Sequence, residues 1–160
     1  MKIVEYNREK VKQYAKKWAY LRNPVYYDYD KIGGDCTNFV SQCIFAGCAC
    51  MNYEKAGWYY KNANQKSPSW TGVEFLYQFL TKNKSVGPFG KITDKERLQV
   101  GDLIQLSFDG NVYSHSLLVI EKTKDDVYVA THTFDSYGKR LSSYQYQNVR
   151  MIHIEGVRMW

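Results

Sequence analysis

The apolar residues in the first half of the chain recur at the spacing of an α-helix. Asn7 is a residue type that often caps a helix N-terminus. The stripe after it predicts a first helix with the apolar positions Val11, Tyr14, Ala15, Trp18 and Leu21. We expect this helix to end within residues 22–24, because the residue before Pro24 avoids helical backbone angles.

A second helix is predicted directly after Gly33 and Gly34. Asp35 stands where its N-cap would be, and Gly47 suits its C-terminal end. Its apolar positions follow the spacing i, i+3, i+4, i+7, i+8: Cys36, Phe39, Val40, Cys43 and Ile44. A third helix is expected over about residues 71–80. Its inward side would hold Val73, Leu76, Tyr77 and Leu80.

The second half of the chain changes to the short apolar runs that are typical of β-strands. We expect strands at residues 103–108, 115–123, 127–133 and about 151–157, separated by turn-forming glycine and aspartate residues. Helices therefore come first and strands second. This order predicts a single α+β domain over residues 1–160, with the N-terminal helices packed on one antiparallel β-sheet.

Composition and charge narrow the possible partners. The 160 residues are 44% hydrophobic, which is enough for one core, and the net charge is +6. The positive charge is spread along the chain, so a nucleic-acid partner is not expected. No apolar run approaches the roughly 20 residues of a membrane span, and the N-terminus does not read as a signal peptide. The expected location is the cytoplasm, or outside the cell if this is a domain of an exported precursor.

Cys36 is the strongest candidate for chemistry. It follows Gly33-Gly34-Asp35 and opens the second predicted helix, where unpaired N–H groups and the helix dipole favour negative charge. Such a position lowers the pKa of a thiol and can also stabilise an oxyanion. The alternative is that Cys36 is a small buried helix residue.

His115 is the candidate base for this thiol, because it begins a predicted strand at the edge of the sheet. His132 lies in the next strand and could orient the His115 ring if the hairpin register places both on one face. A slip of one residue would separate them, and Thr131 or Asp135 would then be the better orienting group. For His115 alone, a polar residue at a strand edge is the alternative interpretation.

Several other polar residues have structural explanations. Asp35 could be a helix cap, and Asp102 could form a turn before the first strand of the second half. His153 alternates with apolar residues and is expected to face solvent. Cys43, Cys48 and Cys50 lack the paired C-x2-C spacing of a zinc knuckle, so no metal is expected.

Aromatic residues flank the cysteine motif on both sides. They could line a substrate groove, and core packing is the alternative for each: Tyr26, Tyr27, Tyr29, Trp58 and Trp70.

The run Asp35-Cys36-Thr37-Asn38-Phe39-Val40-Ser41-Gln42 resembles the putative amidase domain of Firmicutes, a branch of the NlpC/P60 and CHAP papain-like superfamily. Weaker similarities follow in the same order at residues 6–8, 22–24, 67–70, 101–105, 114–116 and 130–133. The resemblance covers nearly the whole chain. It implies a papain-like (NlpC/P60-like) fold and a thiol amidase or peptidase without cofactor. Cys36 would be the nucleophile, His115 the base and His132 the third polar residue.

This resemblance also implies a substrate class, which is an amide or peptide bond, as in peptidoglycan of the bacterial cell wall. Hydrolysis through a thioester on Cys36 is the first hypothesis. The second is a non-catalytic papain-like module that binds an anionic glycan or peptide. The third is acyl transfer, in which His132 and Asp135 would act as base and orienting group. The sequence leaves the oligomeric state and the role of Cys48 and Cys50 open.

Overall fold

The computed structural model describes residues 1–160, and its first helix begins where the sequence predicts. Helix α1 (Arg8–Trp18) is capped by Asn7, whose side-chain oxygen accepts a hydrogen bond from the N–H of Lys10 at 3.1 Å. The helix ends at Trp18, earlier than predicted. Leu21, the last residue of the predicted stripe, is 59% exposed, so burial does not extend the helix that far.

Helix α2 (Cys36–Cys48) is the central helix, and only Phe45 and Ala46 within it are not buried. The residue that ends it is Ala49, which takes the left-handed conformation with φ 56°. The prediction for Gly47 was wrong. Gly47 lies inside the helix, where a Cβ atom would come within 2.4 Å of Val11, so its role is the close contact between α1 and α2.

The predicted third helix is divided into two. Helix α3 (Pro68–Thr71) is a single turn, and α4 (Val73–Lys82) follows after Gly72, whose backbone is extended. Leu76 and Leu80 are buried as predicted, together with Phe79.

The strands form one antiparallel sheet of seven, in the order β1-β9-β5-β6-β7-β8, and β4 pairs with β9 off this path. Their bounds are β1 (Lys2–Val4), β4 (Gly87–Thr93), β5 (Leu103–Ser107), β6 (His115–Lys122), β7 (Val127–Thr131), β8 (Ser136–Arg140) and β9 (Asn148–Met159). A separate hairpin is formed by β2 (Tyr60–Asn62) and β3 (Gln65–Lys66). Two short 3-10 helices are η1 (Lys95–Arg97) and η2 (Leu141–Ser143).

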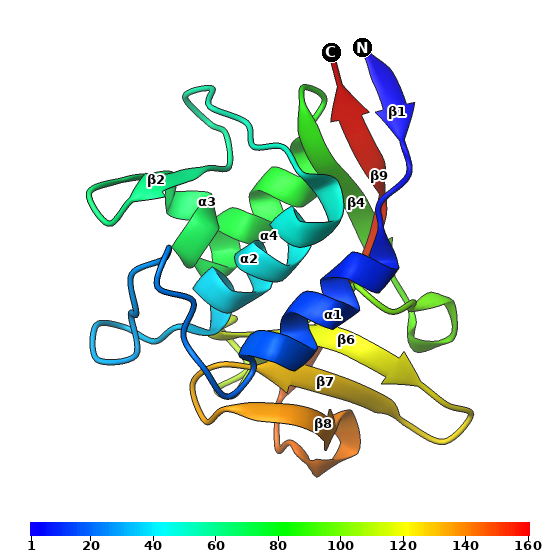
Figure 1. The fold of residues 1–160 in the computed structure, drawn as a ribbon. Helices are drawn as coiled ribbons and strands as arrows, with labels where there is room; N and C mark the ends of the chain where they lie inside the picture. Colours follow the sequence, from blue (N-terminus) through cyan, green and yellow to red (C-terminus); the bar gives the residue numbers. More distant parts are fainter.

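Both faces of the sheet carry a core. Leu118 and Ala130 belong to the larger core, which the helices cover, whereas Leu117 and Val129 belong to a smaller core on the opposite face. Burial on both faces explains why β6 reads as a continuous apolar run. Figure 1 shows α1 and α2 packed over the sheet, with the two chain termini side by side, where β1 pairs with β9.

The α+β prediction with helices on an antiparallel sheet is confirmed. The four predicted strands correspond to β5, β6, β7 and β9, while β1, β4 and β8 were not predicted. None of the helices combines the length and the apolar composition needed to cross a lipid bilayer.

Candidate active site

Cys36 is the first residue of α2 and is 7% exposed. Among the groups that act on the pKa of its Sγ is the backbone N–H of Ser116, the residue after His115. The Oγ1 of Thr37 lies 3.8 Å from the same sulfur and 2.9 Å from the Oγ of Ser116. The first turn of α2 is therefore held against the start of β6.

The pKa of the Cys36 thiol is raised above its ordinary value because the sulfur is buried, which disfavours the charged thiolate. The N–H of Ser116 and the hydroxyl and N–H of Thr37 act in the opposite direction, and the Asp35 carboxylate adds to the rise. The sequence predicted a lowered pKa. The helix N-terminus does supply favourable N–H groups, but desolvation of the thiolate outweighs them.

His115 is also 7% exposed, and burial lowers its pKa to about 4, with a further contribution from the positive charge of Lys139. Its Nε2 lies 3.4 Å from the Oγ1 of Thr131. No hydrogen bond joins the imidazole to the Sγ of Cys36, and Nδ1 of His115 has no hydrogen-bond partner in the protein.

The register of the β6–β7 hairpin decides which side chain of β7 lies on the same face of the sheet as His115. Glu121 pairs with Tyr128 but Val119 pairs with Val129, so one extra residue of β6 is inserted between these pairs. Without that insertion, His115 and His132 would point to one face of the sheet. With it, Thr131 shares the face of His115, and His132 points to the other.

His132 is consequently bonded elsewhere, and the expectation that it orients His115 is corrected. Its Nδ1 lies 2.6 Å from Oδ2 of Asp35, its Nε2 lies 2.8 Å from the carbonyl oxygen of Trp18, and its ring stacks on Phe39 with centroids 4.2 Å apart. Asp135 is not available to His115 either, because it accepts two hydrogen bonds from the guanidinium of Arg22.

Asp35 occupies the N-cap position of α2, yet its side chain makes no capping hydrogen bond. Its Oδ1 instead accepts hydrogen bonds from the N–H of Tyr29 at 2.8 Å and from the side-chain amide of Asn38 at 2.9 Å. Its backbone N–H donates to the Oγ1 of Thr133 at 3.0 Å. Asp35 is therefore the N-cap residue, as predicted, but its side chain does not cap the helix. The residue joins the loop before Cys36 to the segment after β7.

Asp102 and His153 also have more partners than the sequence indicated. Asp102 is fully buried and accepts the turn hydrogen bond from Gln99, as expected, but it also accepts hydrogen bonds from Arg8 and from the N–H of Ile154. Nδ1 of His153 lies 2.9 Å from the second carboxylate oxygen, so His153 is only partly exposed rather than free in solvent. This cluster ties α1 to β9, away from Cys36.

A pocket of about 510 Å³ adjoins His115. The rings of Phe108 and Tyr144 line it, and their centroids lie 6.3 and 6.2 Å from the His115 ring. The remaining lining residues are Ser142, Gln145, Tyr146 and Gln147. Of the aromatics that the sequence offered for a groove near Cys36, Trp58 and Trp70 are buried against one another. Tyr26 and Tyr29 are half-buried, and Tyr27 is 45% exposed.

Comparison with known proteins assigns the chain to a family. A sequence profile described as "Putative amidase domain" matches residues 5–155, and the chain belongs to this family. The description supports a hydrolase of amide bonds in general.

The chain is also similar to the uncharacterized protein YhbB of Bacillus subtilis (strain 168), with 33% identity over 137 residues. That match covers 82% of this chain and 43% of the relative, so the chain spans less than half of the relative's length. No solved structure matches the chain significantly.

Proposed function

We propose that the protein hydrolyses an amide or peptide bond, with Cys36 as nucleophile and His115 as general base. The observation that carries this proposal is the link that Thr37 makes between Cys36 and β6. Its hydroxyl lies 3.8 Å from the Cys36 sulfur and 2.9 Å from the Oγ of Ser116, which brings the thiol to the strand end where His115 begins β6. An amidase family description for 151 of the residues, 5–155, supports the reaction class.

The pKa directions define the resting state of this pair. Because burial raises the pKa of the thiol and lowers that of His115 to about 4, both groups are neutral near pH 7. The thiol therefore loses its proton as it attacks the carbonyl carbon, and His115 accepts that proton.

Thr131 supports the ring form that this step needs. Its hydroxyl lies 2.7 Å from the carbonyl oxygen of His132 and 3.2 Å from that of Ser116, so it donates its proton to a carbonyl. It can then only accept a hydrogen bond from Nε2 of His115. This places the ring proton on Nε2 and leaves the lone pair on Nδ1 to receive the thiol proton.

The reaction would proceed through a thioester. The oxyanion formed on attack is stabilised by N–H groups in the first turn of α2, which lack intrahelical partners. The carbon–nitrogen bond then breaks, and His115 returns the proton to the leaving amine. Water attacks the thioester, gives its proton to His115, and releases the acid while the thiol is restored.

We propose further that the fold is papain-like and that the substrate is a peptide. A nucleophile at the N-terminus of a buried helix, packed on an antiparallel sheet, supports a papain-like architecture. The aromatic and amide-lined pocket beside His115 has room for a peptide substrate such as a cell-wall peptide. That substrate would require the protein to reach the cell wall.

Release of amine from a panel of substrates tests the function. The panel should contain N-acylated peptide amides, primary amides and short cell-wall peptides, with added hydroxylamine to trap a thioester. We expect Cys36→Ser to lower turnover by roughly 10³-fold. The matched control is Cys50→Ser, because Cys50 is half-buried and lies at the far end of α2. Turnover that survives Cys36→Ser would overturn the proposal.

A further inference from the structure

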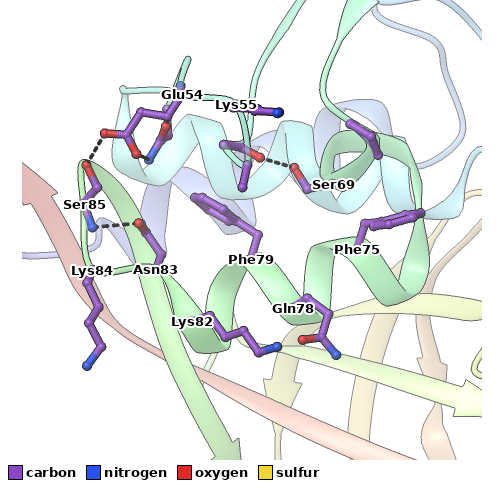
Figure 2. Close-up of a pocket in the computed structure, with 14 residues that line it drawn as sticks. Glu54, Lys55, Ser69, Phe75, Gln78, Phe79, Lys82, Asn83, Lys84 and Ser85 are labelled. Atoms are coloured by element: carbon purple, nitrogen blue, oxygen red, sulfur yellow. Dashed lines mark hydrogen bonds between the residues drawn. The ribbon is translucent and has the colours of Figure 1, made fainter.

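A second and larger pocket, of about 640 Å³, shares no residue with the candidate active site. It lies between α4, the residues around α3 and the loop of residues 52–57 (Figure 2). Four of its lining residues follow the helical spacing i, i+3, i+4, i+7 along α4: Phe75, Gln78, Phe79 and Lys82. One side of α4 is therefore buried in the core, and the adjacent side, which carries these four residues, lines the pocket.

Hydrogen bonds hold the walls of this pocket in place. Asn52 and Trp58 exchange two backbone hydrogen bonds of 2.9 and 2.7 Å, and the side chain of Asn52 donates to the carbonyl of Val86. The hydroxyl of Ser69 donates to the carbonyl of Gly57 at 2.6 Å (Figure 2). A Cβ on Gly57 would lie 2.1 Å from the Asn52 oxygen, so the loop is closely packed and the pocket is preformed.

The charges around the pocket are not balanced. Lys55, Lys82 and Lys84 line it, and none of them forms an ion pair. The single acidic residue, Glu54, already accepts a hydrogen bond of 2.7 Å from Ser85 (Figure 2). The pocket therefore presents a net positive potential to a ligand.

Two further features define the shape of a suitable ligand. Phe75 and Phe79 both line the pocket, with their rings pointing in different directions (Figure 2). Phe75 is 59% exposed and Phe79 is 7% exposed, so each offers a separate apolar contact. The side-chain oxygen of Gln78 is buried without a hydrogen-bond partner, while its nitrogen donates to Glu74 at 2.9 Å. This fixed acceptor calls for an N–H or O–H donor.

We propose that this pocket binds an N-acyl amino acid with an apolar side chain, either as a free molecule or as the C-terminal residue of a peptide. The carboxylate would meet the lysines, the side chain would rest on Phe75 and Phe79, and the amide N–H would donate to Gln78. The inference does not depend on the proposed hydrolysis, since no residue is shared between the sites.

Calorimetric titration with N-acetyl-L-phenylalanine tests the proposal, with N-acetyl-L-phenylalaninamide as the uncharged match and N-acetylglycine as the match without a side chain. The carboxylate form should bind at least roughly tenfold more tightly than either match, and added salt should weaken it. Equal affinity for acid and amide would overturn the proposal.

Lysine variants test whether the ligand binds in this pocket. We expect Lys82→Gln to weaken binding of N-acetyl-L-phenylalanine by about threefold, and the combined change of Lys55, Lys82 and Lys84 to Gln by roughly tenfold or more. The control is Lys124→Gln, an exposed lysine outside the pocket. In NMR titrations, amide chemical shifts that change only outside the residues lining the pocket would contradict this site, and so would an unaltered affinity of the triple variant.

A peptide that ends in phenylalanine, with and without C-terminal amidation, distinguishes the two sources. A free-carboxylate peptide that binds more tightly than the N-acetyl amino acid would identify a peptide C-terminus. Equal binding would identify a small molecule.

Discussion

His115 and His132 are both buried and lie at the same end of neighbouring strands, yet their surroundings differ sharply. Both ring nitrogens of His132 have short partners, at 2.6 Å in Asp35 and 2.8 Å in the Trp18 carbonyl. His115 has one partner at 3.4 Å, and its Nδ1 is free. A ring that is bonded at both nitrogens fixes structure, whereas a ring with a free nitrogen can move a proton.

The largest effect should come from removing the free nitrogen. We expect His115→Gln to lower kcat/KM for amide hydrolysis by roughly 10³-fold, because proton transfer by a positioned base contributes on this scale. The melting temperature should change little. Steady-state kinetics and thermal unfolding of the same preparation check both statements. A variant that keeps its activity would exclude His115 as the base.

His132→Ala should act on stability instead. Because Asp35 is 1% exposed, loss of its histidine partner leaves a buried carboxylate, and we expect a loss of about 3 kcal/mol in the free energy of unfolding. Urea denaturation measures this loss.

The double variant Asp35→Asn/His132→Ala is the control for this pair. Its destabilisation should be smaller than the sum of the two single effects, because both act through one interaction. Strict additivity would show that Asp35 and His132 are not energetically coupled.

Thr131 directly precedes His132 in the sequence, but its hydroxyl lies beside the ring of His115. Thr131→Val should lower kcat by roughly tenfold, since the ring of His115 loses the acceptor that fixes its tautomer. Thr131→Ser retains the hydroxyl and should recover most of the activity. A loss that is equal in both variants would point to packing rather than to the hydrogen bond.

The lowered pKa of His115 predicts a pH dependence of stability. The folded state holds the ring neutral with a pKa of about 4, whereas an unfolded histidine titrates near 6.5. Between these values the unfolded chain binds more protons, so stability should fall as the pH drops from about 6.5 to 4. His115→Gln should show a weaker fall over this window in urea titrations. The same slope in both proteins would assign the effect to other groups.

The smallest expected effect is a difference in reactivity between two thiols. Cys50 is half-buried and its pKa is lowered by a hydrogen bond with Cys48, whereas the pKa of Cys36 is raised. Iodoacetamide should therefore label Cys50 before Cys36 at pH 7, since the thiolate is the reactive form. Mass spectrometry of the labelled peptides gives the order. Faster labelling of Cys36 would mean that the resting pair is ionised.

Local signals made much of the fold predictable. The Asn7 cap, the helical stripe from Cys36 and the apolar runs of β5, β6 and β7 were read from neighbouring residues alone. The strands that were missed depend on distant partners: β1 is three residues long, and β4 contains two glycines and a proline. Such segments become strands because β9 pairs with them, and a local pattern does not contain that information.

The candidate site shows the same limit more clearly. Cys36 and His115 were predicted from the motif and from a strand start, but the choice between His132 and Thr131 depended on one extra residue in β6. The direction of the Cys36 pKa depended on how completely the surrounding chain excludes water. Neither the strand register nor the exclusion of water depends on neighbouring residues alone, so neither could be predicted from the sequence.

Strand β9 has a consequence for the order of folding. It pairs with β1, β4 and β5, and its Ile154 carbonyl accepts a hydrogen bond from Arg8, 146 positions earlier in the chain. During synthesis β1, α1, β4 and β5 must wait for β9, which follows all of them in the chain. Contacts of such long sequence separation slow folding. The nascent chain therefore exposes the edges of β4 and β5 until β9 arrives, and that interval is when aggregation or chaperone binding competes with the native pairing.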